Sequence, residues 1–254
     1  MIYSFKKGKP ERGWILLVHG LGEHIGRYEE FINTLLNKNF GVIGFDLPGH
    51  GKSGGKRGDT SIEEVIEIIN NLTENIENFI IFGHSLGGLI AIRYAQEYPE
   101  KIKAIIVSAP ALYLKTDYIT KVFAHIFVKI FPSLTIDNRL NLNYLSKNKI
   151  AIEKYRNDPL VHRKISLRLG ISMIKNIDIA QKKAELISVP ILFLIPSEDK
   201  IVPPIGSKEL FNNIKISDKY YIEFPGGYHE LFEDEEHSKK FYEEIYNFLI
   251  SRSI

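Results

Sequence analysis

One stretch constrains the fold of this chain more than any other: an apolar run, a glycine-flanked turn and a helix-forming run follow one another directly. The apolar run spans 79–82, continues into Gly83, Ser85 and Gly87, spaced as G-x-S-x-G, and gives way to a helix-forming run over 86–95. A short apolar run bounded by turn residues is typical of a buried strand of a parallel sheet. In a very sharp turn the residues two before and two after the serine approach closely, and glycine at both positions removes the clash. The stretch therefore predicts a strand, a tight turn and a helix, with the Ser85 hydroxyl held out at the carboxyl edge of a sheet.

The same alternation of apolar and amphipathic runs extends over both ends of the chain. Short apolar runs predict strands at 2–5, 14–18, 42–45, 79–82, 104–107, 191–195 and 220–224. Helical periodicity predicts helices at 26–38, from about 61 onward, from 86 to about 98, and at 238–249. Strands that alternate with helices indicate a mostly parallel sheet covered by helices on both faces. We therefore expect a single α/β domain over residues 1–254.

The alternation stops between about residues 111 and 184, where no strand pattern stands out. We expect a helical cap to be inserted here, over the carboxyl edge of the sheet, where the functional loops of open α/β folds lie. Between Ile119 and Ile130 the apolar residues, Ile126 and Phe127 among them, recur at helical spacing opposite a basic face. Two interpretations stay open: a cap helix packed on the protein's own core, and a helix in peripheral contact with a membrane.

Composition excludes several classes of function. Of the 254 residues 44% are hydrophobic and 25% charged, and the net charge is +2, so we expect no nucleic-acid partner. The chain has no cysteine, which rules out disulfides, thiol catalysis and cysteine–zinc sites. The N-terminus lacks the apolar core of a signal peptide, and no run of eighteen apolar residues occurs. We expect a cytoplasmic protein, peripheral at the membrane if the cap touches lipid. The sequence indicates no particular oligomeric state.

A serine hydroxyl becomes a nucleophile only beside a base that a third group orients. In folds with this turn, the acid and then the histidine follow the serine along the chain, each after a later strand. Glu198 and Asp199 both follow the predicted strand at 191–195. We choose Asp199 as the acid, because it stands one step farther into the loop.

The histidine is expected after the next predicted strand, at 220–224. His229 stands there on a glycine-bearing loop, whereas His237 lies in a charged run typical of a solvated helix start. We therefore predict that His229 is the base between Ser85 and Asp199.

The oxyanion of an acyl-transfer reaction needs two N–H donors aimed at it. We expect one from the backbone of Leu86, directly after the nucleophile, and the other from Leu21, in the loop after the strand at 14–18. No cofactor and no metal are expected. The run Gly51-Lys52-Ser53 resembles the end of a phosphate-binding loop, but Asp46 occupies the position of its first glycine, and the histidines form no zinc-binding spacing.

Five stretches carry a wider resemblance: His19-Gly20-Leu21-Gly22-Glu23-His24-x-Gly26-Arg27-Tyr28, Asp46-x-x-Gly49-His50-Gly51-x-Ser53, Gly83-His84-Ser85-Leu86-Gly87-Gly88, Asn157-Asp158-Pro159-Leu160 and Tyr228-His229-Glu230-Leu231. Together they resemble the monoglyceride lipase and lysophospholipase group of α/β-hydrolases, from about Trp14 to the C-terminus.

This resemblance implies a serine esterase that acts on monoacylglycerols or similar single-chain lipid esters beneath a lipid-facing helical cap. It implies that Glu23 and Arg27 lie near the alcohol end of the substrate pocket; an ion pair that only closes the loop is the alternative. Ile126 and Phe127 would contact the acyl chain. Phe232 stands where some relatives carry a second histidine, and the insertion matches the family poorly before Asn157, so the resemblance does not fix the alcohol group.

Two other functions remain open from sequence. The first is a general carboxylesterase or thioesterase for short acyl substrates. The second is a lipid-binding homologue without turnover, against which the intact serine, acid and histidine argue.

Overall fold

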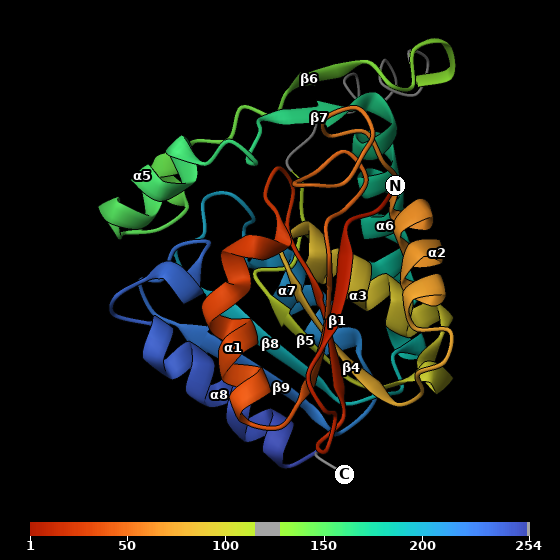
Figure 1. The fold of residues 1–254 in the computed structure, drawn as a ribbon, viewed down its shortest axis with the longest axis vertical. Coiled ribbons are helices and arrows are strands. Elements are labelled where there is room, and N and C mark those ends of the chain that lie inside the picture. The colour runs from red at the N-terminus through yellow and green to blue at the C-terminus, as the bar shows by residue number, and fades with distance from the viewer. Residues whose placement is uncertain (115–127, 253–254) are drawn as a thin grey trace.

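The computed structural model describes residues 1–114 and 128–252, and a seven-stranded sheet runs through the middle of the molecule (Figure 1). The strand order is β1-β3-β2-β4-β5-β8-β9. Only β1 is antiparallel to its neighbour, and the other pairs are parallel. The strands are β1 Ser4–Lys7, β2 Trp14–Val18, β3 Gly41–Phe45, β4 Phe79–His84, β5 Ile102–Ser108, β8 Ile191–Pro196 and β9 Lys219–Phe224.

Helices cover both faces of this sheet, so the predicted mostly parallel α/β architecture is confirmed. One face carries α1 Glu29–Asn37 and α8 Ser238–Ile250, and the other carries α2 Ile62–Leu72, α3 Leu86–Glu97, α6 Leu167–Lys182 and α7 Ile205–Asn213 (Figure 1). Short 3-10 helices join several elements: η1 Ile25–Tyr28, η2 Pro99–Lys101, η3 Leu142–Tyr144, η4 Ala184–Leu186 and η5 Leu231–Glu233.

The two faces of the sheet bury two separate hydrophobic cores. Successive side chains of a strand point to opposite faces. Ile15 and Leu17 therefore join the core beneath α1 and α8, whereas Leu16 and Val18 join the core beneath α2, α3 and α6. Because both faces are covered, the central strands read as continuous apolar runs rather than as alternating ones.

The segment between 111 and 184 departs from the expectation in one respect. It contains two short antiparallel strands, β6 Thr135–Asp137 and β7 Lys164–Ser166, besides the helix α5 Lys149–Asn157. The expectation that no strand occurs here was wrong. Strands of three residues are too short for a period-two pattern to stand out in sequence. The amphipathic helix predicted around Ile126 and Phe127 lies outside the described residues.

Part of this segment belongs to the main body of the fold, and part lies above the sheet. Its last helix, α6, packs against α2 and α3 and contributes Leu169, Met173 and Ala180 to the core. In Figure 1, β6, β7 and α5 lie above the carboxyl ends of the strands. Among the described residues, no helix is long and apolar enough to cross a membrane.

Candidate active site

Ser85 occupies the turn between β4 and α3, with φ 52° and ψ −115°. A non-glycine residue rarely adopts a positive φ, and such strain costs about 1–3 kcal/mol. The flanking glycines allow the turn, since a Cβ on Gly83 would overlap the carbonyl oxygen of Gly87. The backbone is fixed on both sides: the Ser85 N–H donates to Ser108 at 2.9 Å and the Ser85 carbonyl accepts from Ala111 at 2.9 Å. The predicted strand, tight turn and helix are all present.

Asp199 lies in the loop after β8 and contacts His229 directly. His229 Nδ1 and Asp199 Oδ2 are 2.6 Å apart, and both side chains are buried. The other carboxylate oxygen, Oδ1, accepts the N–H groups of Ile201 and Val202, each at 2.8 Å. Glu198, the rival acid, is exposed. The loop therefore holds Asp199, and not its neighbour, against the imidazole.

This contact sets the charge balance of His229. Burial lowers the pKa of the imidazole, but the charge of Asp199 and the hydrogen bond from Nδ1 outweigh it, so the pKa is raised above its ordinary value. With Nδ1–H donated to Asp199, Nε2 is the nitrogen that can accept a proton. The arrangement suits a general base.

His237, the rejected rival, is not the solvated residue that its charged neighbours suggested. It is buried at the start of α8, with its ring 5.9 Å from that of Phe224. Glu235 and Glu236 beside it are exposed, as expected. The expectation of a solvated His237 was wrong, because Phe224 and Gly227, from β9 and the loop after it, lie against the ring.

A cavity of about 870 Å³ connects these groups. Its lining includes Ser85, His229, Leu21, Leu86 and Glu23. The inserted segment contributes the apolar lining residues Ile136, Leu140, Leu145, Ile165, Ile171, Met173 and Ile174, and also the polar residues Asp137, Asn138, Arg139, Asn141 and Ser166. Most of the cavity lining is therefore apolar, with polar groups at Ser85, Glu23 and His229 and along the stretch 137–141.

Leu86 and Leu21 stand where oxyanion donors are expected. Leu86 is the first residue of α3, and the first N–H groups of a helix have no acceptor within it. Leu21 follows β2 in the loop that lies against the serine, since a Cβ on Gly20 would lie 3.2 Å from Ser85 Cβ. Their role as N–H donors stays a prediction.

Glu23 and Arg27 form a buried ion pair with Arg27 Nη1 and Glu23 Oε2 2.6 Å apart. The other Glu23 oxygen, Oε1, accepts from the Gly20 N–H at 2.6 Å and from the Tyr28 hydroxyl at 2.8 Å. Burial raises the pKa of Glu23, but the Arg27 guanidinium and other charges outweigh it and lower the pKa to about 2. Glu23 therefore brings an ionised carboxylate to the cavity, held against the loop that carries Leu21.

Arg27 also contacts a carboxylate that the sequence reasoning missed. Its Nη1 and Nη2 donate to the two oxygens of Glu230 at 2.7 and 2.8 Å, and its guanidinium lies 4.7 Å from the centre of the Tyr155 ring. Glu230 directly follows His229 in sequence. The only signal in the sequence was this adjacency, which does not show a partner more than two hundred residues away.

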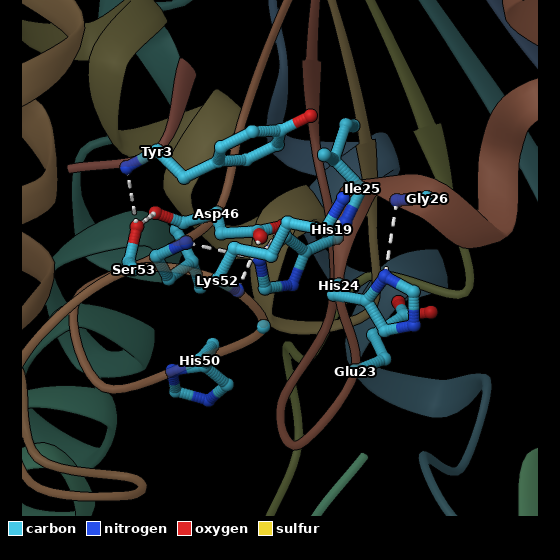
Figure 2. A network of polar contacts seen from close by, with 12 residues as sticks. Tyr3, His19, Glu23, His24, Ile25, Gly26, Asp46, His50, Lys52 and Ser53 are labelled. Carbon is cyan, nitrogen blue, oxygen red and sulfur yellow. Dashed lines mark hydrogen bonds and ion pairs between the residues drawn. The ribbon is translucent and has the colours of Figure 1, made fainter. Parts of the chain in front are cut away.

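A second polar network, around Asp46, fixes the loop after β2 (Figure 2). The carboxylate of Asp46 accepts the N–H groups of Ile25 and Lys52, each at 2.7 Å. The Ser53 hydroxyl donates to the Asp46 carbonyl oxygen at 2.6 Å and accepts from the Tyr3 N–H at 2.9 Å. The run 51–53, which resembled a phosphate-binding loop, thus hydrogen-bonds to Asp46. Asp46 in turn holds Ile25, the first residue of η1.

His24 links the same loop to the inserted segment. Its Nδ1 accepts from the Gly26 N–H at 3.1 Å (Figure 2), so its Nε2 carries the proton and donates to Asp158 at 2.8 Å. With the Arg27–Glu230 pair and the approach of Gly20 to Ser85, all five sequence stretches therefore meet around the loop after β2.

Comparison with known proteins agrees with this geometry. Residues 9–236 match the family described as serine aminopeptidase, S33. A phospholipase from Bacillus subtilis is 32% identical over 249 residues, covering 94% of this chain and 96% of the relative. A monoacylglycerol lipase from Mycolicibacterium smegmatis is 29% identical over 236 residues, covering 89% of this chain and 84% of the relative.

Among solved structures, the crystal structure of a monoacylglycerol lipase from Paleococcus ferrophilus matches with a TM-score of 0.97 at 47% identity, and all of both chains is covered. The family match spans most of the chain, and the order of serine, acid and histidine along it is that of α/β-hydrolases. The chain belongs to the serine aminopeptidase S33 family of α/β-hydrolases, in the group that includes the monoglyceride lipases.

Proposed function

We propose that this protein hydrolyses monoacylglycerols through an acyl-enzyme formed on Ser85. The observation that carries the proposal is the 2.6 Å contact between Asp199 and His229 at a cavity that Ser85 also lines. His229 Nε2 takes the proton of the Ser85 hydroxyl as its oxygen attacks the ester carbonyl, and Asp199 stabilises the imidazolium that forms. The N–H groups of Leu21 and Leu86 bind the oxyanion.

The tetrahedral intermediate then collapses. The bond between the carbonyl carbon and the alcohol oxygen breaks, and His229 returns its proton to the leaving glycerol. Water enters, gives a proton to His229 and attacks the acyl-Ser85 carbonyl carbon. The bond from that carbon to Ser85 Oγ then breaks, His229 passes its proton to Oγ, and the fatty acid leaves. No cofactor is required at any step.

The lining of the cavity supports a single-chain lipid as substrate. Apolar side chains such as Ile136, Ile165 and Met173 suit an acyl chain. At the polar end, the ionised Glu23 carboxylate suits the hydroxyls of an alcohol group, and Arg27 acts by holding Glu23 in place. The names of the relatives agree, since two of them are monoacylglycerol lipases.

We propose that residues 111–184 form a cap within one α/β domain over residues 1–254, and that this cap contacts lipid peripherally. In the described part of the segment, four large apolar side chains close together in sequence are exposed: Ile130, Phe131, Leu134 and Ile136. An exposed apolar patch of this kind is typical of an interaction surface.

A general carboxylesterase or thioesterase for short acyl substrates is the second candidate. One panel of substrates separates the two candidates. The value of kcat/KM is measured on monoacylglycerols of increasing chain length, a long-chain triacylglycerol, a lysophospholipid, an acyl-CoA, short p-nitrophenyl esters and an aminoacyl anilide. The proposal expects monoacylglycerols to give the highest kcat/KM and the anilide to give no turnover. Equal rates on short esters and thioesters would favour the general esterase. Binding of lipid without a burst of p-nitrophenol would instead favour a non-catalytic homologue.

A further inference from the structure

A cluster of metal-ligand side chains lies just beyond the His229 loop, between η5 and α8. One ligand atom each from Asp234, Glu236 and His237 lies within 4.8 Å of the others. None of the three lines the substrate cavity. The cluster therefore plays no part in the reaction described above.

Two atoms of this cluster are buried without a partner. Asp234 Oδ2 and His237 Nε2 make no hydrogen bond within the described chain, and their residues are 2% and 7% exposed. The other oxygen of Asp234 is engaged, since Oδ1 accepts from the Glu236 N–H at 2.9 Å. Buried polar atoms in folded proteins are ordinarily satisfied. With its proton on Nδ1, His237 presents Nε2 as an acceptor beside Asp234 Oδ2, and one ligand that accepts lone pairs satisfies both atoms.

We propose that Asp234, Glu236 and His237 bind a divalent cation of the zinc class. Glu236 Oε2 and His237 Nε2 are 3.9 Å apart. Donors about 2.1 Å from a tetrahedral ion lie about 3.4 Å apart, so this pair must close by about 0.5 Å on binding, which the exposed Glu236 side chain allows. One imidazole and two carboxylates suit Zn²⁺ better than Ca²⁺ or Mg²⁺, which take oxygen ligands only, and water would complete the tetrahedron.

The charges around the cluster affect its affinity for a cation. Lys147 Nζ lies 3.9 Å from Glu236 Oε2, and the N-terminus of α8 begins beside His237, so both oppose a cation. The charges of the two carboxylates outnumber that of Lys147, whose half-exposed ammonium also lies over the Tyr228 ring, 5.6 Å from its centre. A bound ion would fasten the end of η5 to the start of α8. It would therefore stabilise the folded state without entering the active site.

Calorimetric titration of tag-free, chelator-treated protein with ZnCl₂ tests the proposal, with the melting temperature as a second readout. We expect one ion per chain, a melting temperature that rises with zinc concentration, and visible absorption of tetrahedral Co²⁺ when cobalt replaces zinc. Glu236→Gln, at an exposed position, should weaken binding at least about tenfold, because even residues that merely orient a ligand matter by that much. His237→Ala should abolish it.

Glu235→Gln is the matched control, since Glu235 is the exposed neighbour outside the cluster, and it should leave the affinity unchanged. Stoichiometric binding that persists in Glu236→Gln and His237→Ala would overturn the assignment. So would the absence of any zinc-dependent change, which would mean that a water molecule satisfies Asp234 and His237. Zinc that instead coordinates His229 would inhibit hydrolysis, and this inhibition would persist in Glu236→Gln. The same variant therefore distinguishes binding at His229 from binding at the proposed cluster.

Discussion

Arg27 binds Glu230 in a bidentate manner, with hydrogen bonds of 2.7 and 2.8 Å from its two Nη atoms to the two carboxylate oxygens. Because Arg27 also pairs with Glu23, whose carboxylate accepts from the Gly20 N–H, the contact joins the loop of the proposed oxyanion donor to the residue after His229. Bidentate pairs between arginine and carboxylate hold geometry better than single bonds do. Arg27 therefore joins the loop of the proposed oxyanion donor to the His229 loop through Glu23 and Glu230, which both line the cavity.

Removal of the Arg27 side chain should lower both the stability of the fold and the rate of hydrolysis. Arg27→Ala would leave two buried carboxylates, Glu23 and Glu230, without their cation, and a broken buried pair costs about 3–5 kcal/mol. We expect a fall in melting temperature together with a loss of kcat. Glu233→Gln is the control, since Glu233 lies 3.8 Å from Arg27 and is more exposed, and it should change stability by less than about 1 kcal/mol. Equal melting temperatures for both variants would contradict a clamp at Arg27.

The acid side of the rate profile should reflect His229. An ordinary histidine has a pKa of about 6.5. Because Asp199 raises the pKa of His229 above this value, its imidazole becomes protonated at a higher pH. Only the neutral imidazole acts as base, so kcat/KM should fall as pH drops through a midpoint above about 6.5. Asp199→Asn removes the charge that raises the pKa, so the midpoint should move down and kcat should fall by about four powers of ten.

The matched control for this profile is Glu198→Gln, at the exposed neighbouring carboxylate, which should keep the midpoint and the rate within a few-fold. A profile that moves in the Glu198 variant and not in the Asp199 variant would mean that the wrong acid was assigned.

The turn at Ser85 should tolerate no side chain at its first glycine. A Cβ on Gly83 would overlap the Gly87 carbonyl oxygen, so Gly83→Ala should destabilise the fold or displace Ser85 and abolish activity. Gly170→Ala is the opposite case: Gly170 lies inside α6 with nothing within 4 Å of the added carbon. Alanine there should raise stability by about 0.5–1 kcal/mol. Thermal unfolding of the two variants checks both signs, and a stable, active Gly83→Ala would contradict the geometry.

The exposed apolar residues of the inserted segment should mediate lipid contact. Ile130→Ser combined with Phe131→Ser should weaken binding to phospholipid vesicles and leave hydrolysis of a water-soluble ester unchanged, since both side chains are exposed. Ile250→Ser is the control: Ile250 is also exposed, but it ends α8 at the opposite end of the molecule (Figure 1). Vesicle binding that falls equally in both proteins would contradict a localised lipid surface.

The sequence predicted the sheet, its helices and the meeting of Asp199 with His229, because each residue follows an apolar run and the carboxyl ends of parallel strands share one edge. It did not predict Glu230 as a partner of Arg27, since the two are far apart in sequence and neither belongs to a periodic pattern. It missed β6 and β7, which are three residues long. It misjudged His237 because Phe224, outside the charged run, covers the ring.

The most direct test of the account is the site at which a fluorophosphonate attaches. This reagent phosphonylates an activated serine, and mass spectrometry of the digested protein identifies the modified peptide. The account predicts one label per chain, on the peptide that contains Ser85, with loss of hydrolysis in proportion to labelling and no label in Ser85→Ala. A label on another serine, or a Ser85→Ala protein that still hydrolyses monoacylglycerol at a rate close to that of the wild type, would contradict it.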